Sequence, residues 1–280
     1  PRSFSGAAHA HPERALGLRA MSRGPAASEA LLRLSAVSLS FGPVEVLKGL
    51  DLEVRHGEFV ALVGPSGCGK TTLLNLCSGW LRPTSGEVHR AGRVRMVFQE
   101  DGLFPWQTVG ENVRAGLRHV SDAGECRRRA SDLIGLVGLA GFEDHYPHQL
   151  SGGMRQRVEL ARALAGDTDL LLMDEPFSSL DYLTRLRMRG ELARLLREQP
   201  RTVVLVTHDI EEAAQLADRV LVLSERPGRV RDEVRLDVPR PRRATQPEVV
   251  QAVHHVLTEL GLESETEPAS APEAGRKESA

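Results

Sequence analysis

The segment Gly64-Pro65-Ser66-Gly67-Cys68-Gly69-Lys70-Thr71 follows directly on the apolar run Phe59–Val63. It matches the pattern G-x-x-x-x-G-K-[ST], which binds the phosphates of a nucleoside triphosphate when it joins a buried strand to a helix. Both neighbours fit, because Phe59–Val63 is typical of a buried strand and Thr72–Gly79 has helical character. A chance glycine-rich turn would not have this context. The sequence therefore predicts a phosphate-binding loop within an α/β fold.

The chemistry of this loop predicts that it binds ATP with Mg²⁺. Residues without a Cβ let successive backbone N–H groups curl around phosphate oxygens, and the helix N-terminus adds a positive dipole end. Lys70 is one of only three lysines among 36 basic residues, and its compact charge suits the β- and γ-phosphates better than arginine's planar fork. Thr71 is predicted to offer its hydroxyl to Mg²⁺. The predicted nucleotide-binding residues of the loop are Gly64, Pro65, Ser66, Gly67, Cys68, Gly69, Lys70, Thr71 and Thr72.

Apolar patterns on either side of the loop predict the rest of the fold. Residues 31–41 and 50–54 come close to apolar–polar alternation, as half-buried strands of an antiparallel sheet do. The runs Leu170–Met173, Thr202–Val206 and Arg219–Leu223 are typical of buried strands, and helical patterns lie between them. We therefore expect a parallel sheet covered by helices on both faces, preceded by an antiparallel β subdomain.

Three segments depart from this alternation of strands and helices. Residues 100–157 carry helical patterns but no good strand, which predicts a helical subdomain inserted between sheet segments. Residues 1–28, rich in Ala, Arg, Pro and Gly, predict a disordered extension, with an organelle transit peptide as the alternative. Residues 263–280, rich in Glu, Ser, Ala and Pro, predict a disordered tail. The ATP-binding domain is then expected over residues 29–262.

The bulk composition narrows the class of protein. With 41% hydrophobic and 26% charged residues, the 280-residue chain is typical of a globular protein. The formal net charge of −2 gives no support to a nucleic-acid partner. The apolar runs fall far short of the roughly 20 residues that a membrane span needs. Three scattered cysteines predict neither a disulfide framework nor a zinc site, which fits a reducing cytoplasm.

Polar side chains follow three of the predicted strands, at the sheet edge where the loop opens. Asp174 comes directly after an apolar run and is predicted to hold Mg²⁺. Its neighbour Glu175 is predicted to orient or deprotonate the attacking water, although a turn with a helix cap is the alternative for such a pair. His208 is predicted to contact the γ-phosphate, and Gln99 to ligate Mg²⁺ or position water. These residues predict hydrolysis in addition to binding.

Upstream of Asp174 the chain reads Leu150-Ser151-Gly152-Gly153-Met154-Arg155-Gln156-Arg157. This segment resembles the signature sequence of the ATP-binding cassette (ABC) family. The phosphate loop, Gln99, the signature, Asp174-Glu175, Ser179-Leu180-Asp181 and His208 also occur in the order of that family, so the resemblance covers roughly residues 31–238. It implies a P-loop NTPase (RecA-like) core with an N-terminal antiparallel β subdomain and a helical subdomain insertion.

The resemblance also implies an ATP site that two cassettes share. Ser151, Gly152 and Gly153 of one cassette would contact ATP bound to the other, with the Ser151 hydroxyl and the Gly153 backbone N–H directed at the γ-phosphate. Asp181 would carry information across the interface between them. Phe41 occupies the place of the aromatic residue that stacks on adenine, with simple core packing as its alternative. The implied partner is a second ABC ATPase subunit, expected to be an identical chain.

A finer resemblance concerns the transported solute. Residues 98–106, 174–185 and 223–229 look like those of the importer subgroup for nitrate, sulfonate and taurine, which also includes importers of bicarbonate and of thiamine pyrimidine precursors. This implies ATP hydrolysis that powers uptake, with separate transmembrane permease subunits and an extracytoplasmic solute-binding protein in the complex. The subunit would then lie at the cytoplasmic face of the cell membrane as a peripheral protein.

Some alternatives remain open at the level of sequence. Phe104, Pro105 and Trp106 are predicted to line the groove that receives the permease, or else they pack within the helical subdomain. A soluble ABC ATPase of DNA repair or of the ribosome is the rival function, although such chains usually carry two cassettes, coiled-coil arms, zinc sites or basic linkers. A nucleotide switch without turnover would lack the carboxylate that Glu175 supplies.

Overall fold

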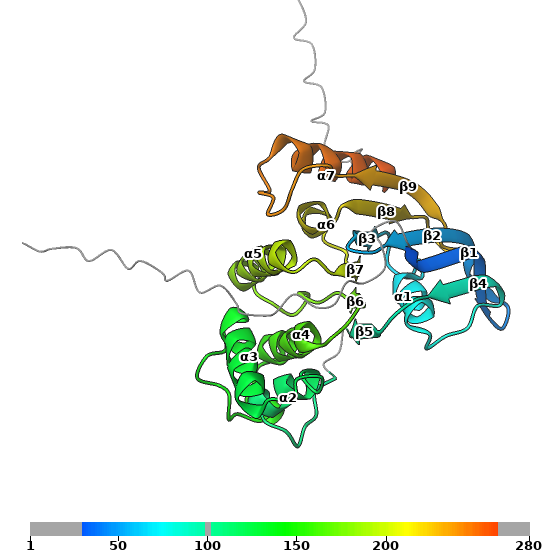
Figure 1. The fold of residues 1–280 in the computed structure, drawn as a ribbon. Helices are drawn as coiled ribbons and strands as arrows, with labels where there is room; N and C mark the ends of the chain where they lie inside the picture. Colours follow the sequence, from blue (N-terminus) through cyan, green and yellow to red (C-terminus); the bar gives the residue numbers. More distant parts are fainter. Residues whose placement is uncertain (1–29, 99–101, 263–280) are drawn as a thin grey trace, which may run out of the picture.

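The computed structural model describes residues 30–98 and 102–262, and it contains two β-sheets with helices packed around the larger one (Figure 1). Gln99, the predicted N-terminal extension and the predicted C-terminal tail lie outside the described residues. The smaller sheet has the order β2-β1-β4, with β1 (Ala30–Phe41), β2 (Val44–Arg55) and β4 (Ser85–Arg90) antiparallel. Burial alternates along much of β1 and β2, so the predicted antiparallel subdomain is confirmed.

The larger sheet has six strands in the order β5-β6-β7-β3-β8-β9. Its strands are β5 (Val94–Val97), β6 (Leu170–Asp174), β7 (Thr202–Val206), β3 (Phe59–Val63), β8 (Arg219–Leu223) and β9 (Val230–Arg235). The first five run parallel, and β9 pairs antiparallel with β8. Every residue of β3, β6 and β7 is buried, as expected for strands covered on both faces. Their carboxyl ends therefore meet at one edge, which positions the polar residues that follow them.

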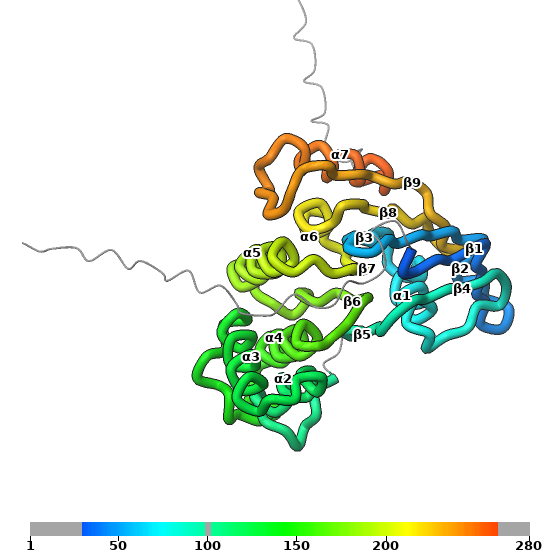
Figure 2. The backbone as a smooth tube through the Cα atoms, viewed as in Figure 1, coloured from blue at the N-terminus to red at the C-terminus, as the bar shows by residue number. Residues whose placement is uncertain are grey.

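The two faces of this sheet pack against different partners. On one face, Val60 and Leu62 share an apolar cluster with the small sheet and with α1 (Lys70–Ser78). On the other face, Phe59, Ala61 and Val63 share a cluster with helices including α5 (Tyr182–Glu198) and α6 (Ile210–Leu216). The tube in Figure 2 shows this order of layers, with the small sheet and α1 on one side and α5 and α6 on the other. The predicted parallel sheet with two covered faces is confirmed.

The helical segment predicted between sheet strands consists of α2 (Val109–Gly116), α3 (Ala123–Leu136), the short 3₁₀ helix η1 (Pro147–Gln149) and α4 (Gly152–Ala165). Helices α2, α3 and α4 pack on one another through the larger apolar cluster (Figure 1). Helix α4 is continuous to Ala165, so the predicted subdomain limit at residue 157 falls inside a helix. The limits of this subdomain stay a prediction.

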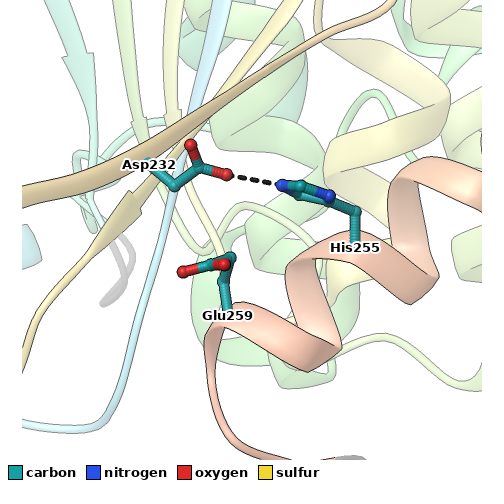
Figure 3. A group of neighbouring side chains, drawn as sticks. All are labelled: Asp232, His255 and Glu259. Carbon is teal, nitrogen blue, oxygen red and sulfur yellow. Dashed lines mark hydrogen bonds and ion pairs between the residues drawn. The ribbon is translucent and has the colours of Figure 1, made fainter.

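Two C-terminal elements were not predicted from the sequence, and only the helix carries a pattern that could have been used. Helix α7 (Pro247–Glu259) buries Val249, Ala252 and Val256, the spacing of one helix face. It packs beside β9, where His255 Nε2 lies 2.6 Å from Asp232 Oδ2 (Figure 3). The hydrogen bond from His255 lowers the pKa of Asp232. Strand β9 is rich in charged residues because it forms the edge of the sheet, and this conceals it from a search for apolar runs.

No helix within the described ranges combines the length and the apolar character that crossing a membrane would need.

Candidate active site at the carboxyl edge of the sheet

The loop from Gly64 to Thr71 joins the end of β3 to the start of α1. Gly67 and Gly69 have φ values of +75° and +105°, a region that residues with a side chain rarely adopt. A Cβ on Gly69 would also lie 2.8 Å from Leu47 Cδ2, so this leucine side chain would have to move to admit one. The backbone thus curls at the N-terminus of α1, which is the geometry that cradles anionic oxygens.

Lys70 begins α1, and its side chain reaches back over the loop. Its Nζ donates hydrogen bonds to the carbonyl oxygens of Gly64 at 2.7 Å and Pro65 at 2.9 Å. These contacts hold the ammonium group at the mouth of the loop, where a phosphate group would meet it.

The loop forms one wall of a cavity of about 520 Å³. That volume is in the range of small-molecule sites. Its lining residues come from the small sheet, the phosphate loop, the strand ends and the segment after β8, and they are Phe41, Val44, Val46, Ser66, Gly67, Gly69, Lys70, Thr71, Thr72, Glu175, Val206 and Arg226. Sheet order therefore brings together residues that are far apart in the sequence.

Asp174 ends β6 and is 3% exposed. Burial raises the pKa of its carboxyl group, while a hydrogen bond with Thr71 and the charge of Lys70 act in the opposite direction. The two predicted protein ligands of Mg²⁺ within the described residues, Thr71 and Asp174, are thus in contact. A buried carboxylate beside a hydroxyl is a donor set that suits a hard divalent cation, so these residues fit the predicted ion.

Glu175 follows with φ +47°, an uncommon value for a residue with a side chain. Its backbone N–H donates to Val206 O at 2.9 Å, which ties the residue to the end of β7. Its side chain lines the cavity, and its Oε2 lies 3.2 Å from Nδ1 of His208. The structure therefore brings together two of the three predicted catalytic residues, and the third, Gln99, is outside the described residues.

The residue after His208 belongs to a cluster of charged side chains that connects α5 and α6. Asp209 caps α6 by accepting from Glu212 N at 2.9 Å, and it pairs with Arg189 of α5. Glu212 lies 3.3 Å from the same guanidinium, and burial raises the pKa of Glu212 to about 8. These contacts join α5 and α6 at the residue that directly follows the exposed His208.

Two further residues, Phe41 and Arg226, also line the cavity. Phe41 ends β1 and is 51% exposed, which excludes the alternative that it packs in the core. Arg226 was not predicted as a site residue, yet its Nε and Nη2 donate to Gly67 O at 3.1 and 3.0 Å. The only signal in the sequence was that residues 223–229 matched an importer subgroup, which suggested no contact with the phosphate loop.

The signature residues lie outside this cavity. Ser151 is the N-cap of α4, and its hydroxyl accepts from Met154 N at 3.3 Å. Among the described residues that line the cavity, none belongs to residues 151–153. Asp181 similarly caps α5 by accepting from Thr184 N at 3.0 Å. Hydrogen bonds from the side chain and then the backbone of Thr184 lower the pKa of Asp181. The chain therefore presents two groups of predicted ATP-binding residues at separate places.

A second cavity, of about 270 Å³, lies between β5 and the helical subdomain, and Phe104 lines it. The Arg162 guanidinium is 5.2 Å from the centre of the Phe104 ring. Trp106 is 71% exposed, with its ring 5.7 Å from that of Phe104, and it does not belong to the cavity lining. Phe104 therefore lines this cavity, whereas Pro105 and Trp106, the other two residues predicted to line a docking groove, do not.

Comparison with known proteins gives consistent matches. The model of the family described as ABC transporter matches residues 47–178. The chain is 43% identical over 238 residues to the aliphatic sulfonates import ATP-binding protein SsuB 1 of Agrobacterium fabrum, covering 84% of this chain and 86% of that protein. It is 49% identical over 224 residues to SsuB 1 of Rhodococcus jostii, covering 78% and 88%.

Two solved structures of ATP-binding cassettes also match this chain. A dimeric structure of the ATP-binding cassette MJ0796 in a post-hydrolysis state, bound to ADP and Pi, superposes with a TM-score of 0.66 at 34% identity. It covers 74% of this chain and 99% of that chain. A second dimeric structure of MJ0796, described as a bacterial ABC transporter cassette, gives a TM-score of 0.67 with the same coverage.

Proposed function

The chain belongs to the ABC transporter family as an ATP-binding subunit of the importer type, an ATPase whose turnover is coupled to transport, and we propose that it powers the uptake of a small sulfonate-type solute. One observation supports the motor function most directly: Lys70, Thr71 and Glu175 line one cavity, with Asp174 in contact with Thr71. The solute class rests on the names of relatives that are 43% and 49% identical over most of their length.

We infer the following roles for the residues around ATP. The loop backbone and Lys70 bind the β- and γ-phosphates, and Phe41 stacks on the adenine ring. Thr71 and Asp174 hold Mg²⁺, which when bound neutralises charge on the phosphate oxygens. Glu175 accepts a proton from the attacking water, and His208, whose Nδ1 lies 3.2 Å from Glu175 Oε2 in this structure, turns to the γ-phosphate.

The separation of Ser151 from the cavity supports a shared site. We infer that two copies of the chain face each other, so that Ser151 and Gly153 of one approach the ATP held by Lys70 of the other. The dimeric form of the MJ0796 cassettes, 34% identical to this chain, supports this arrangement. Closure of the two copies on ATP and their release after hydrolysis would then shift the equilibrium of the attached permease, because ATP binds the closed state more tightly.

The remaining partners follow from the same proposal. The subunit docks on transmembrane permease subunits at the cytoplasmic face of the membrane, and an extracytoplasmic binding protein delivers the solute. The cavity lined by Phe104 is the proposed contact with the permease. Trp106 lies beside it and is free to make a contact of its own.

Uptake by reconstituted vesicles tests this proposal. The full chain is combined with permease and binding-protein subunits that co-purify with it, and uptake of labelled ethanesulfonate, taurine, nitrate, bicarbonate and a thiamine pyrimidine precursor is measured with internal ATP. We expect ATP-dependent uptake of a sulfonate and none with Glu175→Gln. Uptake of another of these solutes would replace the sulfonate assignment and keep the motor function. Active ATPase without uptake of any solute would contradict the importer function.

A further inference from the structure

Gln156 is a buried polar residue that joins two parts of the ATPase machinery. It lies on α4, little more than one turn beyond Ser151, and is 4% exposed. Its Nε2 donates to Glu175 O at 3.0 Å, and its Oε1 accepts from Ser179 N at 3.2 Å and from the Ser179 hydroxyl. The amide therefore uses both its donor and its acceptor on one segment of chain, the residues that follow β6.

That segment carries the proposed catalytic carboxylate in a strained conformation. Glu175 has φ +47°, which a residue with a side chain keeps only when its surroundings hold it there. On one side, its N–H is fixed by Val206 O of β7 at 2.9 Å. On the other side, its carbonyl oxygen accepts from Gln156, from Ser178 N at 3.2 Å and from Ser178 Oγ at 3.0 Å. Gln156 is the only one of these partners that comes from the helical subdomain.

The same segment also touches the signature residues at the start of α4. A Cβ on Gly153 would lie 3.1 Å from both Ser179 O and Leu180 Cδ2, so the two backbones are in close contact there. The segment then continues to Asp181, the N-cap of α5. Helix α4 and residues 175–181 are thus joined at two places, by close packing at Gly153 and by hydrogen bonds at Gln156.

This junction matters if the ATP site is shared, as proposed above. In that arrangement, Ser151 and Gly153 of a chain contact the ATP of the opposite site, whereas Glu175 of the same chain serves its own site. We propose that Gln156 is a positioning residue that transmits engagement of the signature segment to Glu175, so that ATP held at one site aligns the catalytic carboxylate at the other. A buried amide that only satisfies local hydrogen bonds would affect stability without such a link.

Substitution of Gln156 tests the proposal in the purified full-length chain. Gln156→Met keeps the length and removes every hydrogen bond. Gln156→Glu keeps an acceptor for Ser179 but places an oxygen against the carbonyl of Glu175. For both variants we expect kcat for ATP hydrolysis to fall about 10-fold or more, because small misplacement of a reacting group is costly. The KM for ATP should stay within about 2-fold, and the Hill coefficient for ATP should fall toward 1.

The matched control is Gln215→Met. Gln215 is a buried glutamine of α6, and its side chain donates to Glu211 on the same helix at 2.8 Å. It should lose as much thermal stability as Gln156→Met but keep its kcat and Hill coefficient. The proposal is overturned if Gln156→Met keeps kcat within about 2-fold, or if Gln215→Met loses as much kcat as Gln156→Met at the same loss of Tm. Absence of ATPase activity in the parent chain would instead contradict the proposed function.

Discussion

The phosphate loop and the signature segment are both rich in glycine, and each leads into a helix. Their surroundings differ. The loop closes around a cavity whose other walls come from this chain, among them Phe41, Glu175 and Arg226. The signature segment caps α4 with Ser151 and takes no part in lining that cavity. A helix N-terminus with glycines is thus not enough to place a segment at the cavity, and this difference is the basis of our proposal that one chain holds only part of what surrounds each ATP.

The largest effect is expected for Glu175, which lines the cavity beside the phosphate loop, and it separates ATP binding from ATP hydrolysis. Glu175→Gln removes the proton acceptor but keeps the size of the side chain, so we expect kcat for ATP hydrolysis to fall by about 10² or more. Binding of ATP should persist, and the variant should accumulate as an ATP-bound dimer. Steady-state turnover and size-exclusion chromatography with ATP measure the two effects. A variant that hydrolyses ATP at the parent rate would refute the role assigned to Glu175.

The next effect tests whether the two regions serve one site from different chains. Lys70→Ala impairs the loop, and Ser151→Asp puts a negative charge toward phosphate while remaining a good N-cap. Each variant alone should have little ATPase activity. Half of the dimers in an equal mixture would be mixed, and each would hold one intact site of two, so the number of sites that bind ATP should recover to about a quarter of the parent value. The ATPase activity should recover to at most about a quarter, and to less where hydrolysis also needs ATP at the second site. Assays of the mixture against each variant alone provide the measurement.

Neither ATP binding nor ATPase activity above that of the separate variants, in a mixture that does form mixed dimers, would show that loop and signature act within the same chain. Exchange of two differently tagged variants, followed by pull-down, checks that mixed dimers are present.

A smaller effect is expected at the adenine side of the cavity. Phe41→Ala removes the exposed ring that we propose to stack on the base, and stacking of a base on an aromatic side chain contributes about 1–3 kcal/mol. The KM for ATP should therefore rise about 10-fold while kcat stays close to that of the parent chain. Trp80→Ala is the control, since Trp80 is 78% exposed and does not line the cavity. An unchanged KM for Phe41→Ala would remove the stacking proposal.

The smallest effect concerns the segment after β8. Arg226→Ala removes the guanidinium that holds Gly67 O, so the loop should become less well ordered and the KM for ATP should rise a few-fold, about the effect of one exposed charge-assisted hydrogen bond. Arg229→Ala, an exposed arginine of the same segment, is the control. Equal KM values for the two variants would show that the contact at Gly67 does not support binding.

Much of the fold was predictable because it follows local patterns. The buried strands β3, β6, β7 and β8 are short apolar runs, and each lies where the pattern predicted it. Strand β9 and helix α7 were not predicted. The strand is a charged edge, and the helix was overlooked although its apolar spacing was visible.

The candidate site, too, could be predicted from the sequence only in part. Motif spacing alone placed Lys70, Asp174 and Glu175 together, because the carboxyl ends of parallel strands meet at one edge. The contact between Arg226 and Gly67 joins residues 159 positions apart, and that between Gln156 and Glu175 joins α4 to the end of β6. No period or motif in the sequence specifies such pairs, since they depend on how separate elements pack.

By itself, the sequence was enough to predict an ATP-binding loop at residues 64–71, followed by strand-end carboxylates in a parallel sheet. These conclusions were possible because glycine spacing, buried strands and helix starts each follow from a short local pattern of residue types. Only the tertiary structure decided that Ser151 lies apart from the cavity and that Gln156 bonds to Glu175. Distances between elements are set by the packing of the whole core, which no local stretch of sequence contains.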